Sequence, residues 1–216
     1  MASKRSLTNI KRVGFMQGRL VPSEKKNRIQ YFPDKNWKEE IIIAKKNNFR
    51  IMEWTINIEN IKKNPLFMDS QINELKKYLR EKKVKVKSVT CDFFMQKPFF
   101  KSHKNKFVLN MLKKLIINGQ NLGIKYFIIP LVDQSSIKNK KQENQIIKKM
   151  KKLKNILRKD GKILFEIDYS PKKIIEFIKM FNSSKFGINY DTGNSAGQGY
   201  NFNDAKPYFK YVKNIH

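Results

Sequence analysis

The chain is poor in cysteine and histidine. Its 216 residues include one cysteine, Cys91, and two histidines, His103 and His216. A single cysteine excludes a disulfide within the chain, and a lone thiol is typical of a reducing compartment. We therefore expect a cytoplasmic protein.

Long apolar runs are also missing. No stretch approaches the ~20 apolar residues that a membrane-spanning helix needs. The basic start at residues 1–5 is not followed by the apolar segment of a signal peptide, so we expect neither a membrane span nor a secretory signal. Hydrophobic residues make up 40% of the chain, which suffices for the core of one large domain. We assign residues 1–11 to a loose basic tail and residues 12–216 to a single domain.

Acidic residues are scarce beside the basic ones. There are 18 Asp and Glu against 47 Lys and Arg, which gives a formal net charge of +29. The excess is nearly all lysine, whereas contacts to phosphates and bases favour the planar fork of arginine. Runs such as residues 148–154 are typical of the solvated face of an amphipathic helix. We favour a biased composition over a nucleic-acid surface, and expect only a nonspecific attraction to anions that weakens with salt.

Apolar segments alternate along the chain with segments of helical period. The predicted strands cover residues 12–16, 50–56, 84–91, 126–132, 162–167, 186–190 and 211–216. The predicted helices cover residues 37–47, 69–82, 102–122, 142–158 and 170–182, with a short helix from about residue 203. Residues 92–98 and 193–199 are predicted to be loops. This alternation indicates a parallel sheet and an α/β fold.

Two α/β architectures compete for this pattern. A doubly wound sheet would carry G-x-G-x-x-G after the first strand, and that motif is absent. A (β/α)8 barrel places its active site at the C-terminal ends of its strands, and polar residues stand at those ends here. They are Gln17, Arg19, Glu53, Asp92, Glu166, Asp191 and His216. We therefore predict a (β/α)8 TIM-type barrel with about seven βα units present and the eighth missing.

Three of these polar residues recur at a constant interval. Glu166, Asp191 and His216 are each 25 residues apart, at the same place in successive strand–helix units. Carboxylate and imidazole ligands without a thiolate suit Mn²⁺, Mg²⁺, Co²⁺ or Zn²⁺. Two alternatives stay open: Asp168 shares a strand face with Glu166 and could be the ligand, and Asp191 could be an ordinary turn residue.

A second set of residues consists of candidates for substrate binding. They are Gln17, Arg19, Glu53, Trp54, Asp92 and Asn194. Glu53 could bind hydroxyl groups or pair with a lysine. Gln17 and Arg19 could hold a phosphate or hydroxyl or belong to a surface loop. Trp54 could line a substrate pocket or belong to the core.

Five segments together resemble the xylose-isomerase-like TIM barrels, the sugar phosphate isomerase/epimerase family. They are residues 14–20, 51–54, 88–95, 188–194 and 212–216, and the resemblance runs from about residue 12 to the end. It implies a divalent metal held by Glu166, Asp191 and His216, three of the family's four ligands. The fourth ligand, a glutamate on the eighth strand, and that strand itself have no counterpart in this sequence.

The resemblance implies an isomerase or epimerase of a sugar, sugar phosphate or related polyol or hydroxy-ketone, working through an enediolate with Glu166 as acid–base residue. The family pairs this residue with the eighth-strand glutamate, so activity of this chain alone is an open question. The alternatives are an inactive truncated barrel or an interaction module. An abasic-site endonuclease is less favoured because its three-metal cluster needs several histidines. Expected partners are a small-molecule sugar or sugar phosphate, with a homo-oligomer left open.

Overall fold

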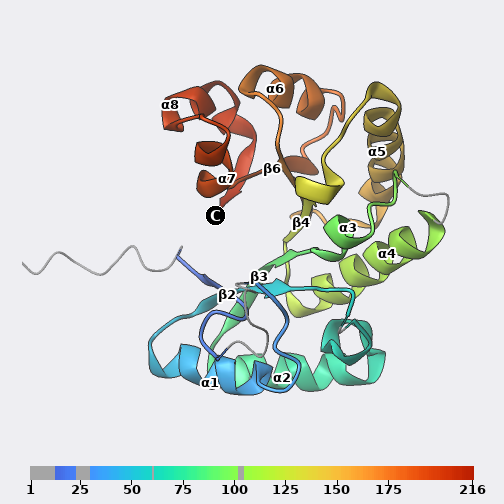
Figure 1. The fold of residues 1–216 in the computed structure, drawn as a ribbon. Helices are drawn as coiled ribbons and strands as arrows, with labels where there is room; N and C mark the ends of the chain where they lie inside the picture. The colour runs from blue at the N-terminus through green and yellow to red at the C-terminus, as the bar shows by residue number, and fades with distance from the viewer. Residues whose placement is uncertain (1–12, 23–29, 60, 102–104) are drawn as a thin grey trace, which may run out of the picture.

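One curved parallel sheet with helices on its outer side makes up the fold (Figure 1). The computed structural model describes residues 13–22, 30–59, 61–101 and 105–216. Their strands are β1 (Phe15–Met16), β2 (Ile51–Thr55), β3 (Lys85–Thr90), β4 (Tyr126–Leu131), β5 (Lys162–Ile167), β6 (Phe186–Tyr190) and β7 (Val212–Ile215). These seven described strands pair in sequence order, each parallel to its neighbours. The predicted barrel-type α/β fold with seven successive units is confirmed.

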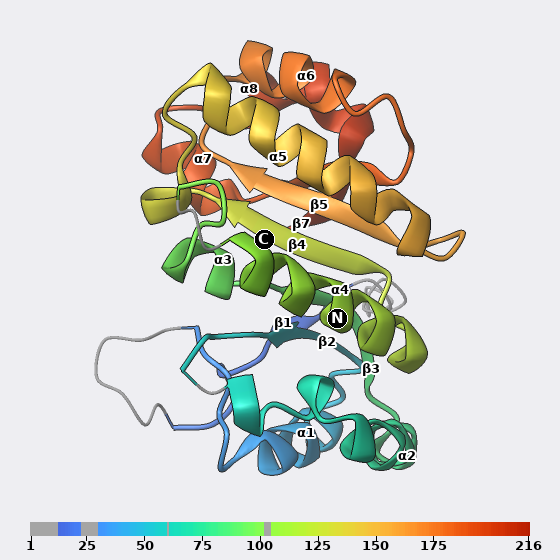
Figure 2. The same cartoon turned by 90° about the vertical axis from the view of Figure 1, so that its right-hand side faces the viewer.

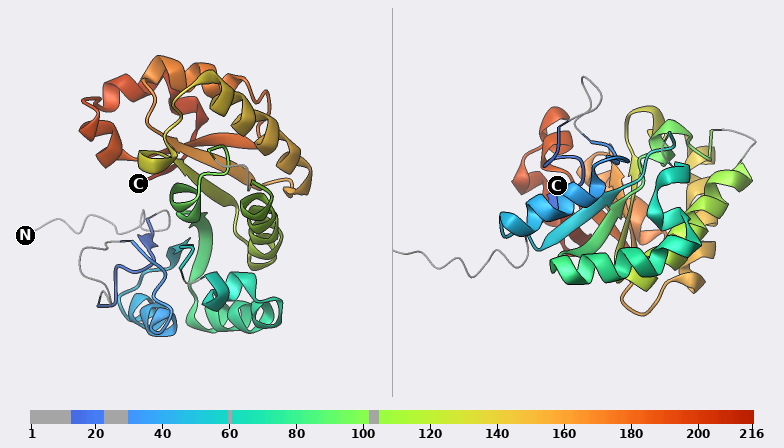
Figure 3. Two further views of the ribbon diagram at one scale, coloured as in Figure 1. Left: turned by 45° about the vertical axis from the view of Figure 1, so that its right-hand side comes forward. Right: turned by 90° about the horizontal axis from the view of Figure 1, so that it is seen from below.

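The helices connect the strands and follow the outside of the sheet, as Figures 1 and 3 show. They are α1 (Trp37–Lys46), α2 (Ile72–Lys82), α3 (Phe93–Gln96), α4 (Asn105–Leu122), α5 (Lys140–Leu153), α6 (Pro171–Lys179), α7 (Thr192–Gly197) and α8 (Phe202–Ala205). Short 3-10 turns cover Ile61–Lys63, Pro65–Phe67, Asp69–Gln71, Asp133–Ser135, Lys154–Ile156 and Lys206–Tyr211. None of these helices combines the length and the apolar composition needed to cross a bilayer, within the part of the chain that is described.

Two segments predicted as loops contain short helices instead. The segment after β3 forms α3, because Phe93 and Phe94 are buried on one turn. The segment after β6 forms α7, which Asp191 caps by accepting from the backbone N–H of Asn194. The glycines of α7 lower its helix propensity and conceal it in the sequence. The predicted tail (1–11) and the first residues of the helix predicted from 102, including His103, lie outside the described residues.

The core lies between the sheet and the outer helices. Successive side chains of a strand point to opposite faces, so alternate residues of β5 and β6 face the helices. Phe165 of β5 meets Phe177 of α6 with ring centroids 5.2 Å apart, and it stacks on Phe181 at 4.9 Å. Phe186 of β6 completes this aromatic cluster at 4.4 Å from Phe181. The cluster anchors the strands that carry the polar residues facing inward, Glu166 among them.

The loop after β1 is held by a buried carboxylate of α1. Glu40 is fully buried, and its Oε1 accepts from the backbone N–H groups of Gly18 at 2.7 Å and Leu20 at 3.1 Å. Burial raises the pKa of Glu40, although the backbone hydrogen bonds act in the opposite direction. The contact fixes the chain just after Gln17, at the C-terminal end of β1.

Gly18 should tolerate no side chain. Its φ is +89°, and a Cβ there would lie 2.6 Å from the backbone oxygen of Tyr31. Gly123 is the matched control, because its φ is +93° and a Cβ there would meet nothing within 4 Å. We expect Gly123→Ala to lower the free energy of unfolding by ~1–2 kcal/mol through the left-handed backbone alone. Gly18→Ala should cost roughly 1–3 kcal/mol more because the backbone must shift. Equal losses in urea denaturation would contradict the predicted clash.

Candidate active site

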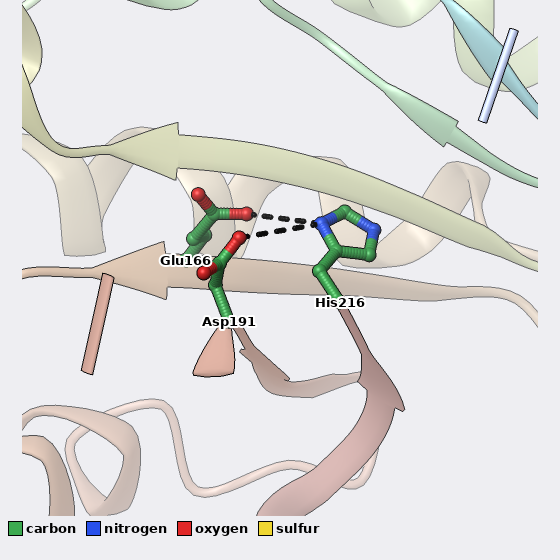
Figure 4. Close-up of side chains that lie close together, drawn as sticks. All are labelled: Glu166, Asp191 and His216. Carbon is green, nitrogen blue, oxygen red and sulfur yellow. Dashed lines mark ion pairs between the residues drawn. The ribbon is translucent and has the colours of Figure 1, made fainter. Parts of the chain in front are cut away.

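Three side chains with metal-ligand chemistry converge at the C-terminal ends of β5, β6 and β7 (Figure 4). The Nδ1 atom of His216 lies 3.4 Å from Oε2 of Glu166 and 4.0 Å from Oδ2 of Asp191. One ligand atom from each residue lies within 4.8 Å of the others. The side chains of His216 and Glu166 are 14% and 12% exposed, so the cluster is shielded yet open on one side.

Neighbouring groups hold each member of this cluster in place. Asn189 donates to Oε2 of Glu166 at 2.8 Å, and Asn194 of α7 donates to Oε1 at 2.8 Å. Oδ1 of Asp191 accepts from the backbone N–H of Asn194 at 2.7 Å, which leaves Oδ2 directed toward His216 (Figure 4). The backbone N–H of His216 donates to the oxygen of Tyr190 at 2.8 Å. The two carboxylates and the imidazole are therefore preorganised by the strand ends and the first turn of α7.

Glu53 of β2 approaches the same histidine from the opposite side. Its Oε1 lies 2.8 Å from Nε2 of His216, so the imidazole stands between two groups of carboxylates. Ser88 donates to Oε2 of Glu53 at 2.6 Å, and the hydroxyl of Thr90 donates to Oε1. Asn214 lies 3.4 Å from Oε2 of Glu53, which links β7 to β2 across the sheet interior.

Four further residues that the sequence pattern does not indicate belong to the site: Asn189, Asn214, Ser88 and Thr90. Asn214 donates to the side-chain oxygen of Asn189 at 2.9 Å, so the amides connect Glu53 with Glu166. Strand alternation is the sequence feature that could have identified the two asparagines. Asn189 and Asn214 each stand two residues before a predicted ligand, on the same face of the strand.

Charge and burial act against each other at His216. Burial lowers the pKa of the imidazole, but the carboxylates of Glu166 and Glu53 outweigh it and raise the pKa to about 10. The raised pKa favours the protonated ring, whose charge partly compensates the surrounding carboxylates.

The other predicted substrate-binding residues lie in different surroundings. Gln17 is fully buried, and its Oε1 accepts from the backbone N–H of Thr55 at 3.1 Å. Trp54 is also fully buried and donates to the side chain of Asn64 at 3.1 Å, in the core outside the cluster. Arg19 is exposed. Only Glu53 and Asn194 among these candidates touch the three clustered residues directly, as far as the described contacts go.

Asp92 forms a separate acidic position at the end of β3. The side chain of Gln30 lies 3.0 Å from both of its oxygens, and that of Asn57 lies 3.4 Å from one. Burial raises the pKa of Asp92 to about 7, with the charges of Glu166 and Glu53 acting in the same direction and the hydrogen bonds opposing them. Asp92 therefore changes its charge near neutral pH.

Asp168, the alternative to Glu166 as a ligand, has a different partner. Its Oδ2 accepts from the hydroxyl of Ser136. The clustered carboxylate of β5 is Glu166.

A pocket beside Glu166 is lined by Glu166, Asp191 and Asn194 together with Tyr169, Tyr190 and Tyr208. It lies at the end of the sheet toward which the strands point, where Figure 2 shows α7 close to the tip of β5.

The cluster fits a divalent cation. Ligand atoms that share an ion with bonds of ~2.0–2.2 Å must lie roughly 3–4 Å from one another. The two separations from Nδ1 of His216, 3.4 and 4.0 Å, meet this condition, and all three ligand atoms lie within 4.8 Å of one another. Two carboxylates and one imidazole form a mixed oxygen and nitrogen set, as hard or borderline divalent ions require.

The fold and the site together define a class of protein: a TIM-type barrel with an Asp–Glu–His cluster at the C-terminal ends of its strands. The sequence matches the family described as xylose isomerase-like TIM barrel over residues 41–216. The chain belongs to this family. A search of curated protein sequences finds no significant match.

Solved structures of low sequence identity share the fold. A D-psicose 3-epimerase from Clostridium cellulolyticum H10, solved with D-tagatose, has a TM-score of 0.70 and 14% identity over 94% of this chain and 72% of its own. A xylose isomerase-like TIM barrel protein from Mycobacterium smegmatis, solved with magnesium, has a TM-score of 0.69 and 14% identity over 94% and 73%. A xylose isomerase domain protein from Planctomyces limnophilus has a TM-score of 0.69 and 11% identity over 94% and 70%.

Asp92 should make the stability depend on pH. Its folded pKa of about 7 lies above the ordinary value of 3.8, so the folded protein keeps a proton that the unfolded chain releases. The contribution of Asp92 to the free energy of unfolding therefore falls as the pH rises from about 4 to about 7. Asn cannot ionise. We expect the free energy of unfolding of Asp92→Asn, relative to the parent, to rise by roughly 2–4 kcal/mol across this window, measured by urea denaturation. A difference that stays constant with pH would contradict the raised pKa.

Proposed function

We propose that the protein is a divalent-metal-dependent isomerase or epimerase of a sugar, sugar phosphate or related polyol or hydroxy-ketone. The observation that carries this proposal is the convergence of Glu166, Asp191 and His216 at the ends of three consecutive barrel strands. Membership of the xylose isomerase-like family and the structural likeness to a ketose 3-epimerase support the same class of substrate.

Glu166, Asp191 and His216 would hold the ion, with Mn²⁺, Mg²⁺, Co²⁺ and Zn²⁺ as the candidates. A bound divalent ion supplies a Lewis acid that polarises a carbonyl and stabilises the negative charge of an enediolate. The donor groups are already aligned by Asn189, Asn194 and the strand ends, so little reorganisation is needed.

Glu166 is the residue we assign to proton transfer. Its Oε2 faces His216, whereas Oε1 is held by the amide of Asn194 at the edge of the adjoining pocket. A carboxylate there can take the proton from the carbon next to the substrate carbonyl. Proton removal to the enediolate is therefore the step that this chain's own residues account for. Return of a proton to the same carbon on the same face of the enediolate would exchange that hydrogen with solvent. Delivery of the proton to the neighbouring carbon would give isomerisation.

Metal binding gives the first test of this site. We expect the protein to bind Mn²⁺ with a micromolar dissociation constant in isothermal titration calorimetry. Loss of an outer partner of a metal ligand costs ~10–100-fold in affinity, so Asp191→Asn, which alters a ligand itself, should cost more than about 100-fold. Asp168→Asn is the matched control, because that carboxylate belongs to the neighbouring strand end and pairs with Ser136. Equal affinity of Asp191→Asn and the parent would refute the ligand assignment.

Enolisation gives the second test. Incubation of the Mn²⁺-loaded protein with ketoses, aldoses and their phosphates in D₂O should exchange the hydrogen next to the carbonyl for deuterium, detected by NMR. Glu166→Gln should abolish this exchange because it removes the base and also alters a metal ligand, and Asp168→Asn should retain it. If the protein binds Mn²⁺ but exchanges no hydrogen in any of these substrate classes, the proposed isomerase or epimerase activity is refuted.

A further inference from the structure

We propose that Glu53 is the positioning residue of the metal centre, holding His216 so that Nδ1 binds the metal while Nε2 carries its proton toward Glu53. The inference rests on the metal site of the proposed function and deepens it. It gives Glu53 a role different from the substrate contact expected from the sequence.

The two ring nitrogens of His216 face different groups. Nδ1 is directed toward the carboxylates of Glu166 and Asp191, as Figure 4 shows, at 3.4 and 4.0 Å. Nε2 is directed away from them, 2.8 Å from Oε1 of Glu53. A histidine that binds a metal through one nitrogen commonly presents its other N–H to a carboxylate, which fixes the tautomer and the ring orientation. Glu53 occupies this second position.

Three described side chains donate hydrogen bonds to Glu53, and Nε2 of His216 approaches it closely. An ionised carboxylate offers about four lone-pair positions. Oε1 accepts from Thr90 and faces His216, and Oε2 accepts from Ser88 at 2.6 Å and from Asn214 at 3.4 Å. A substrate hydroxyl could reach Glu53 only by displacing one of these described partners. The same four contacts hold the carboxylate rigidly, as a positioning role requires.

The backbone of His216 is fixed independently of its ring. Its N–H donates to the oxygen of Tyr190 at 2.8 Å, and its carbonyl accepts from the backbone N–H of Thr192 at 3.0 Å. These backbone hydrogen bonds do not fix the orientation of the imidazole ring. That orientation therefore depends on what the two ring nitrogens contact. Asn214 adds a second link from the same strand to Glu53, at 3.4 Å.

Without the Glu53 carboxylate, the imidazole would lose the carboxylate partner of Nε2 and keep the amide of Asn189, whose Nδ2 lies 3.1 Å from Nδ1. The tautomer with the proton on Nδ1 cannot bind a metal through that atom, and turning the ring would remove Nδ1 from Glu166 and Asp191. We therefore expect Glu53→Gln to weaken Mn²⁺ binding by ~10–100-fold, the range that such outer partners show.

The test compares Mn²⁺ affinities of the parent, Glu53→Gln and Glu143→Gln by isothermal titration calorimetry. Glu143 of α5 is a matched control, since it is another buried carboxylate, 3% exposed, that pairs with Lys140 and accepts from the hydroxyl of Tyr169. No described contact joins Glu143 to the three clustered residues. Glu143→Gln should leave the affinity within about threefold of the parent. Equal affinity of Glu53→Gln and the parent would overturn the inference.

A second measurement needs no variant and is insensitive to folding defects. ¹⁵N NMR of the Zn²⁺-loaded parent should show the His216 ring protonated at Nε2 and shifted at Nδ1 by the metal. Metal coordination through Nε2 would overturn the positioning role even if metal binds tightly. Failure of the parent to bind Mn²⁺ or Zn²⁺ would instead overturn the proposed function, so the two failures are distinguishable.

Discussion

The structure depends most on how carboxylates are kept inside a parallel sheet. Glu53 and Glu166 face the interior of the curved sheet, where an uncompensated charge would be costly. Hydroxyls, side-chain amides and the imidazole of His216 compensate them, and they come from β3, from β6, from the end of β7 and from α7. Because these partners belong to several separate elements, the polar network also ties together distant parts of the sheet.

Strand alternation connects this network to the stability of the fold. Phe165 and Glu166 are neighbours on β5, and they face the aromatic core and the site respectively. A change in the packing of Phe165 would therefore move the carboxylate that carries the proposed chemistry. The same argument holds on β6, where Ile188 faces the helices and Asn189 holds Glu166. Rigid core packing on one side of each strand is what makes a site built on the other side precise.

Much of this arrangement could be predicted from the sequence. Apolar runs at regular intervals located the described strands, and the constant spacing placed Glu166, Asp191 and His216 at equivalent strand ends. Pairings between remote segments could not be predicted in this way. The contact of Glu53 with His216 joins residues 163 positions apart and depends on the curvature of the sheet. Asn189 and Asn214 each stand two residues before a predicted ligand, but that position alone does not indicate what their amides contact. The short helices α3 and α7 form where burial or a cap outweighs weak propensity.

The charge balance around His216 gives a physical reason for a cation at this position. Three carboxylates, those of Glu53, Glu166 and Asp191, surround one imidazole, so even the imidazolium form leaves an excess of negative charge. Glu53 remains paired through Nε2 in either state, whereas Nδ1 can face a proton or a metal. Exchanging one proton for a divalent ion reduces the excess negative charge while keeping the contact with Glu53. Under the proposed function, a divalent ion would lie on the side of Glu166 and Asp191, and Nε2 of the same ring would remain with Glu53.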